Sequence, residues 1–182
     1  GLVVGNEGAD FSVGANIANI ARLIENKDFA RIEQGTAAMQ NFLQGFRFCK
    51  KPVVTAPAGR TLGGGAETTL AGARIVAAAE TFIGLVEVGA GLIPGAGGCK
   101  EMVRRVVSLP FKERSEKGDV VPLLQKIMET VGTAKVSNNA YEARQMGFLN
   151  QTDKIVMNRD FQLATAKKEV LEMERAGYVP PA

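Results

Sequence analysis

The sequence predicts an α/β protein. Short apolar runs that indicate buried strands, such as residues 2–4, 53–56 and 75–79, alternate with longer segments of helical spacing. From about residue 99 onward the pattern is nearly all helical. The chain has 182 residues, of which 46% are hydrophobic, so it contains enough apolar material for a sizeable core.

The first quarter of the chain predicts a strand followed by two helices. After the strand and a loop over residues 5–14, residues 15–25 have helical spacing, and Asp28 is placed to cap a second helix reaching residue 48. Pro52 ends any helix before it. The predicted buried face of the second helix consists of Phe29, Ile32, Met39, Phe42, Leu43 and Phe46.

The middle of the chain predicts short strands, short helices and glycine-rich connections. Residues 58–65 are expected to form a turn region that ends in three glycines, and residues 66–71 a short helix. Two further strands over 75–79 and 82–85 precede a glycine-rich loop over 86–98. A helix is expected to begin at Lys100 and to reach Val107.

The rest of the chain predicts a helical region. Residues 108–120 are polar and charged, which indicates an exposed connection. Helical segments at 121–131, 138–146 and 159–176 follow, with a short strand at 154–157 and an extended tail. We therefore expect a core over residues 1–107 and a helical C-terminal region over 108–182.

The composition excludes several kinds of chemistry. Without any histidine the chain lacks a Ser-His or Cys-His nucleophile system and most zinc sites, so no metal is expected. Two isolated cysteines, Cys49 and Cys99, indicate a reducing, cytoplasmic location. The net charge of +3 is spread thinly, and no apolar run approaches the roughly 20 residues that span a bilayer. Neither a nucleic acid nor a membrane is therefore an expected partner.

A glycine-rich segment over residues 61–67 stands between a predicted strand and a predicted helix. Its glycines allow close backbone approach, and the unpaired amides at the start of a helix favour negative charge. Such a site could be an oxyanion hole or a phosphate cradle, but the glycines alone favour a tight strand-to-helix turn with close packing. The spacing fits neither the G-x-G-x-x-G dinucleotide motif nor a Walker A loop. The loop over 11–16 offers a second, weaker set of free amides.

Two carboxylates are candidates for proton transfer. Glu67 follows Gly64 by three residues, so on a helix it lies about one turn from the proposed anion site and among uncharged neighbours. Glu87 stands in an apolar run, where a buried acid has a raised pKa suited to acid–base chemistry. The structural alternatives are a helix-stabilising glutamate for Glu67 and a solvent-facing strand end for Glu87.

Six segments, in this order and spacing, resemble those of enoyl-CoA hydratases, the crotonase family. They lie at residues 11–16, 51–56, 62–67, 82–87, 93–98 and 140–149, with "Leu-Gly-Gly-Gly-Ala-Glu" and "Ile-Pro-Gly-Ala-Gly-Gly" among them. The resemblance covers about residues 1–157. It implies the crotonase (ClpP/crotonase-like) fold, a spiral of ββα units with a helical C-terminal region.

The resemblance also implies a reaction, the addition of water across the 2,3-double bond of an enoyl-CoA thioester in fatty-acid β-oxidation. The amides of Ala15 and Gly64 would form an oxyanion hole, and Glu67 and Glu87 would hold and activate the water. The implied substrate-binding residues are Gly14, Asn16, Gly63 and Gly95. Coenzyme A enters as part of the substrate, and no separate cofactor is expected.

The expected assembly is a homo-oligomer such as a trimer, and the segment pattern is similar to hydratase parts fused to a 3-hydroxyacyl-CoA dehydrogenase. Three departures from the family pattern stand out. Asn16 replaces a frequent Asp, Val86 replaces a frequent Pro, and the chain opens directly in a strand. From the last feature we expect an N-terminally truncated fragment that lacks the family's first strands, so that the fragment itself is inactive even where its parent is active.

Two other functions remain open. An enoyl-CoA isomerase, or another enolate-stabilising acyl-CoA enzyme, would commonly keep only one of the two acids. A non-catalytic oligomerisation or structural domain would use both glutamates for packing. Fold alone does not decide among these functions.

Overall fold

The backbone repeats one arrangement, in which two strands are followed by a helix. In the computed structural model, which describes residues 1–110 and 118–181, one unit consists of β2 (Val53–Ala56), β3 (Gly59–Leu62) and α3 (Gly64–Ala71). The next unit consists of β4 (Arg74–Ala78), β5 (Thr81–Gly84) and α4 (Gly98–Val103), with the 3₁₀ turn η1 (Glu87–Ala90) before the helix. The predicted ββα repeat is confirmed.

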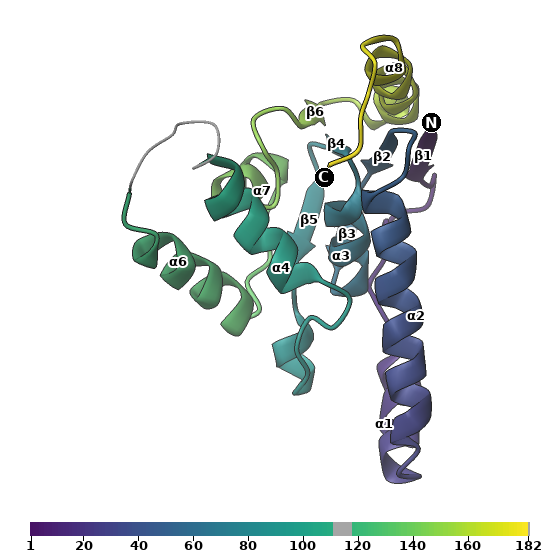
Figure 1. Cartoon of the computed structure of the whole chain (residues 1–182), viewed down its shortest axis with the longest axis vertical. Helices are drawn as coiled ribbons and strands as arrows, with labels where there is room; N and C mark the ends of the chain where they lie inside the picture. Colours follow the sequence, from purple (N-terminus) through teal and green to yellow (C-terminus); the bar gives the residue numbers. More distant parts are fainter. Residues whose placement is uncertain (111–117, 182) are drawn as a thin grey trace.

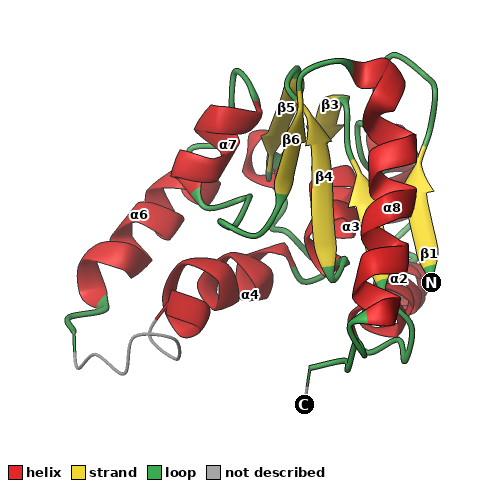
Figure 2. Cartoon of the chain, turned by 90° about the horizontal axis from the view of Figure 1, so that it is seen from above, coloured by secondary structure: helices red, strands yellow, loops and turns green. Residues whose placement is uncertain are grey.

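Each unit contributes one strand to each of two parallel sheets. The first strands join β1 (Leu2–Gly5) and β6 (Lys154–Val156) in a four-stranded sheet of order β1-β2-β4-β6 (Figure 2). The second strands, β3 and β5, pair in a two-stranded sheet, which an isolated bridge from Ser12 to Thr61 extends. The chain therefore brings the loop after β1 to the same edge as β3.

The hydrophobic core lies on both sides of the four-stranded sheet. On one side, Leu70, Ile75 and Phe148 belong to a fully buried cluster that joins α3, β4 and the turn after α7. On the other side, α8 (Gln162–Arg175) packs on β1, β2 and β4 and buries Val54 and Val76. Strands covered on both faces read as continuous apolar runs, which explains why β2 and β4 were predictable.

Two helices, α1 (Ile17–Glu25) and α2 (Phe29–Arg47), project from the body as a hairpin (Figure 1). The predicted cap is confirmed, because the Asp28 carboxylate accepts from the Arg31 amide. The predicted buried face of α2 is only partly right. Leu43 is buried, whereas Phe29 and Phe42 are 60% and 55% exposed.

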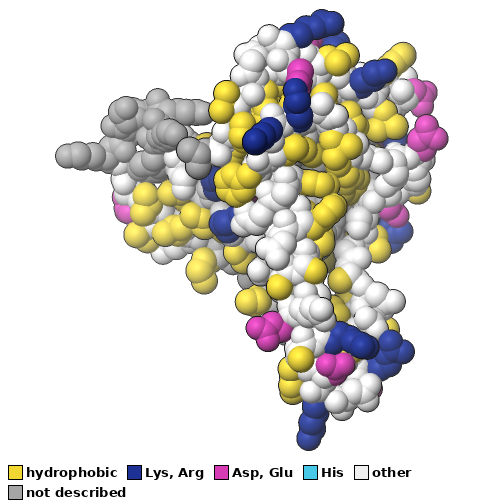
Figure 3. Space-filling view, turned by 45° about the vertical axis from the view of Figure 1, so that its right-hand side comes forward, with side chains coloured by type: hydrophobic (Ala, Val, Ile, Leu, Met, Phe, Trp, Pro, Cys, Tyr) yellow, Lys and Arg dark blue, Asp and Glu magenta, His cyan; other side chains and the backbone are white. Residues whose placement is uncertain are grey.

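The exposure of these two phenylalanines follows from the shape of the molecule. The end of α2 nearest β2 packs on α3, and the remainder extends away from the sheets beside α1. In Figure 3 hydrophobic side chains gather over the central body, and charged side chains cluster at the lower tip of the projection. Helical spacing identifies which side chains share a face, but not what covers that face.

The second half of the chain is helical, as predicted. A π-helical turn, η2 (Arg104–Ser108), continues α4, and α6 (Val121–Gly132), α7 (Ala140–Met146) and the 3₁₀ turn η3 (Arg159–Phe161) follow. Most of the connection expected at 108–120 lies outside the described residues, because residues 111–117 are among those not described. Across the described helices, none has the length and apolar character needed to cross a bilayer.

The division into a core over residues 1–107 and a helical region over 108–182 stays a prediction. β6 pairs with β4 in parallel, and α8 packs on β1, β2 and β4, so elements from the second half complete the main sheet and cover it.

The turn predicted over residues 58–65 is wrong in its first part, where the chain forms β3. Gly59 has φ +58°, and a Cβ there would lie 2.1 Å from the Ala9 carbonyl oxygen, so the position requires glycine. The following residues pair with β5, and the Thr61 side chain is fully buried. A strand of Gly-Arg-Thr-Leu has little apolar character, and its pairing to a distant strand, not its own composition, sets its conformation.

A buried ion pair joins the two halves. One carboxylate oxygen of Asp153 accepts from the Ile75 amide, and the other accepts from the Asn150 amide and from Arg105 at 3.1 Å. Arg105 also donates to the carbonyls of Phe148 and Leu70. Both side chains are 2% exposed, so each charge depends on the other for compensation.

We predict that Asp153→Ala lowers the free energy of unfolding by about 3–5 kcal/mol, because Arg105 is left as an uncompensated buried charge. Urea unfolding followed by circular dichroism would measure the change. Glu129→Ala, which removes an exposed pair with Lys135, is the control and should leave stability unchanged within error. Equal effects of the two substitutions would contradict the assigned role.

Candidate active site

The start of α3 is held in place by a glycine turn after β3. Gly63 has φ +54°, a conformation that favours glycine, and its amide donates to the Gly84 carbonyl at 2.9 Å. Gly64 is the first residue of α3, so its amide has no acceptor within the helix. The helix dipole adds partial positive charge at this point.

The loop after β1 lies against this turn. Ser12 exchanges backbone hydrogen bonds with β3, donating to the Arg60 carbonyl and accepting from Leu62. Gly14 has φ +91°, and a Cβ there would lie 3.1 Å from the Leu62 oxygen and 3.3 Å from the Gly64 nitrogen. The backbone at Gly14 is therefore adjacent to the first amide of α3, and Ala15 follows it directly in the chain.

Asn16 lies next to this pair of loops but is engaged elsewhere. Its side chain is exposed and accepts from the Asn19 amide at 3.1 Å, which caps α1. The structure thus gives Asn16 a local structural role.

Glu67 lies one turn into α3 and is 5% exposed. Its Oε1 accepts from two backbone amides, those of Ala96 and Gly98, each at 2.9 Å. A Cβ at Gly98 would lie 3.1 Å from Glu67 Cγ and 2.7 Å from Leu85 Cδ2, so only glycine allows this approach. The prediction of a cleft or buried position for Glu67 is confirmed.

Glu87 begins η1 and approaches the same glycine turn. A Cβ at Gly63 would lie 3.4 Å from Glu87 Oε1, so the carboxyl group lies over the glycine turn. Both of its oxygens are buried, and neither has a hydrogen-bond partner among the described residues. A buried carboxyl without a partner is costly, which favours a functional over a structural interpretation.

The surroundings raise the pKa values of both glutamates, and burial is the largest cause in each case. Burial raises the pKa of Glu67, while the amides of Gly98, Ala96 and Gly97 act against that rise. Burial also raises the pKa of Glu87, and the nearby charge of Glu67 adds to it. The two glutamates differ in their hydrogen-bond donors. Backbone amides stabilise the ionised form of Glu67, whereas Glu87 accepts from no other described residue.

Gly95 lies outside this group. It is exposed, and its carbonyl accepts from the Gln40 side chain of α2 at 2.6 Å. The structure therefore brings together Gly14, Gly63, Gly64, Glu67 and Glu87. The amides of Ala96 and Gly98 were missed by sequence reasoning, although the paired glycines at 97 and 98 gave a signal for close approach.

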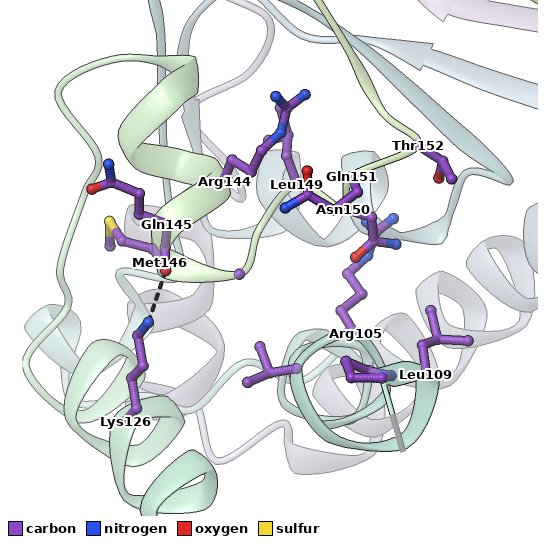
Figure 4. Close-up of a pocket in the computed structure, with 13 residues that line it drawn as sticks. Arg105, Leu109, Lys126, Arg144, Gln145, Met146, Leu149, Asn150, Gln151 and Thr152 are labelled. Atoms are coloured by element: carbon purple, nitrogen blue, oxygen red, sulfur yellow. Dashed lines mark hydrogen bonds between the residues drawn. The ribbon is translucent and has the colours of Figure 1, made fainter. Parts of the chain in front are cut away.

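A cavity of about 320 Å³ lies between η2, α6 and α7 (Figure 4), and neither glutamate lines it. Its cationic side chains are engaged with the protein: Lys126 donates to the Gln145 carbonyl, and Arg144 donates to the Asp153 carbonyl. None of the predicted site residues lines it. In the part of the chain that the structure describes, no cluster of three or more potential metal ligands is present.

Comparison with known proteins places the chain in a family. Residues 2–112 match the family model described as Enoyl-CoA hydratase/isomerase. Over its full length the chain is 41% identical to a "Probable 3-hydroxyacyl-CoA dehydrogenase" of Bacillus subtilis (strain 168), of which it covers 22%. It is 29% identical over 174 residues to a "Putative fatty acid oxidation complex trifunctional enzyme" of Rickettsia felis, covering 93% of this chain and 23% of that protein. The chain thus spans less than a quarter of the length of these relatives.

Solved structures show the same fold. An enoyl-CoA hydratase from Bacillus anthracis superposes with a TM-score of 0.74 at 21% identity, over 95% of this chain and 58% of that one. One from Thermoplasma volcanium gives 0.73 at 24% identity, over 94% and 58%. The predicted crotonase fold is confirmed, and the matched family model shows that the chain belongs to the enoyl-CoA hydratase/isomerase family.

Proposed function

We propose that the chain carries the hydratase site of an enzyme that adds water to an enoyl-CoA thioester. The observation that carries this proposal is the pair of carboxyl groups of Glu67 and Glu87, whose oxygens lie buried near the glycine turn at Gly63 and Gly64. Names of relatives such as "Crotonyl-CoA hydratase" of Syntrophomonas wolfei support the same reaction class. Coenzyme A is then part of the substrate and no further cofactor takes part.

In this proposal the amides of Ala15 and Gly64 bind the thioester carbonyl oxygen. When water adds to the β-carbon, electrons move toward the carbonyl and the α-carbon gains enolate character. Two N–H donors and the positive end of α3 stabilise that charge where it develops. The close packing of Gly14 on the turn sets the spacing of the two donors.

The two glutamates divide the proton transfers. Glu67, whose ionised form is stabilised by the Ala96 and Gly98 amides, takes the proton from water as the oxygen bonds to the β-carbon. Glu87, which lacks such donors and has a pKa raised by burial and by Glu67, gives a proton to the α-carbon. Pairs whose environments differ in this way commonly divide into acid and base.

The alternative within the family is an isomerase, which moves a double bond with one carboxyl group. The presence of both acids at the turn favours the hydratase. A purely structural role would leave the unpartnered, buried Glu87 carboxyl without an explanation.

The assembly remains part of the proposal. A homo-oligomer is supported by the exposed side chains of Ile17, Ile24, Phe29 and Phe42 on the projecting helices. A dehydrogenase module as partner is supported by the name of the Bacillus subtilis relative. A cytoplasmic location stays a prediction from cysteine usage.

We predict that the whole protein that contains this chain hydrates crotonyl-CoA, measured by loss of the enoyl-thioester absorbance. Glu67→Gln and Glu87→Gln should each lower kcat by about 10²–10⁴-fold, because each removes one proton transfer. Glu33→Gln, on the exposed surface of α2, is the control and should keep full activity. Binding of crotonyl-CoA without turnover would move the assignment to another enolate reaction, and absence of binding would favour a structural domain.

Glu87→Gln should also stabilise the fold at neutral pH. The folded pKa of Glu87 is raised above its ordinary value of 4.5, so the folded chain holds a proton that the unfolded chain releases. The contribution of Glu87 to stability is therefore greatest at low pH and is lost as pH rises through its folded pKa. The neutral amide removes this decline, so urea unfolding should show a larger gain at pH 8 than at pH 5. An equal gain at both pH values would contradict the raised pKa.

A further inference from the structure

We propose that Gln40 is a positioning residue, which holds the peptide between Gly95 and Ala96 in the orientation that Glu67 requires. The inference rests on the proposed function for its effect on catalysis. Its structural part concerns the carboxyl group of Glu67 alone and can be tested without any substrate.

The contact consists of two hydrogen bonds to one peptide group. Gln40 Nε2 donates to the Gly95 carbonyl oxygen at 2.6 Å, and the Ala96 amide donates to Glu67 Oε1 at 2.9 Å. This carbonyl and this amide belong to the same peptide plane, so fixing one end fixes the other. In a trans peptide the two groups point in opposite directions, and a donor on the carbonyl polarises the N–H toward its acceptor.

The loop that carries this peptide is anchored on one side of Gly95, where Pro94 is buried and the Leu92 amide donates to the Glu87 carbonyl, but Gly95 itself is exposed. Residues 92–97 contain no helix or strand, and Ile93 is 78% exposed. Thr36, one turn before Gln40 on α2, is near enough that a Cβ at Gly95 would lie 3.6 Å from its methyl group. α2 is therefore the rigid element against which this part of the loop rests.

α2 also supports the region of the second amide that donates to Glu67, that of Gly98. Arg47 donates to the Gly72 carbonyl, just after α3, at 3.3 Å, and lies 3.8 Å from the Glu101 carboxylate of α4. Both side chains are buried. These contacts tie α2 to α3, which carries Glu67, and to α4, whose first residue, Gly98, supplies the second amide.

Replacement of Gln40 can test the Ala96 amide without changing any charge near Glu67. The titratable and charged groups near Glu67 are Glu87 from η1, Arg47 from α2, and Cys99, Lys100 and Glu101 from α4. Gln40 is uncharged and exposed, so its replacement by another neutral side chain alters none of these charges. A change in the titration of Glu67 would then report on the Ala96 amide.

The test compares Gln40→Met, which keeps side-chain length and helix propensity but loses the donor, with Gln34→Met on the same helix. Carboxyl ¹³C resonances of glutamate-labelled protein are titrated, and Glu67→Gln identifies the Glu67 signal. We expect the pKa of Glu67 to rise by about half a unit to one unit in Gln40→Met, because its ionised form loses amide stabilisation. Gln34→Met should titrate as the wild type does, and Gln40→Ala should repeat the shift of Gln40→Met.

The kinetic arm measures hydration against pH. We expect kcat on the acidic limb to fall about three- to tenfold in Gln40→Met, with that limb moved to higher pH and KM unchanged. An unmoved Glu67 titration in both Gln40 variants overturns the inference, whatever their activity. A shifted titration in a whole protein that does not hydrate crotonyl-CoA supports the positioning role and overturns the proposed function instead.

Discussion

The site depends on one interaction: the carboxylate of Glu67 accepts hydrogen bonds from two backbone amides. The amides of Ala96 and Gly98 lie on a loop that leads into α4, whereas Glu67 belongs to α3, so this contact fixes one ββα unit against the next. It offsets the cost of burying a charge and selects which carboxyl group ionises more readily. The close packing of Gly98 on Glu67 and Leu85 leaves no space for a side chain there.

Much of the fold could be predicted from the sequence, because its main signals are local. Apolar runs predicted β2 and β4, and Asp28 as a helix cap predicted the start of α2. Where a segment depends on distant partners, local reasoning failed. β3 is a strand because β5 and Ser12 pair with it, and Phe29 is exposed because α2 extends beyond the body.

The same distinction applies to the site. Glu67 and Glu87 could be proposed from their positions in glycine-rich and apolar segments, and the structure brings them to the same turn. The groups that distinguish the two carboxyls are backbone amides, which any residue type can supply and which spacing alone does not reveal. Gln40 is separated from Gly95 by 55 positions, so only the folded chain relates them. Asn16 caps α1, and its part in substrate binding stays a prediction.

The central claim is that the amides of Ala15 and Gly64 polarise a bound thioester carbonyl between the two glutamates. The most direct test is the ¹³C chemical shift of the carbonyl of labelled crotonyl-CoA bound to the Glu67→Gln, Glu87→Gln double variant, in which turnover is blocked. A downfield shift on binding is expected, because two N–H donors withdraw electron density from the carbonyl. An unchanged solution shift of the bound carbonyl would show that these amides do not polarise it.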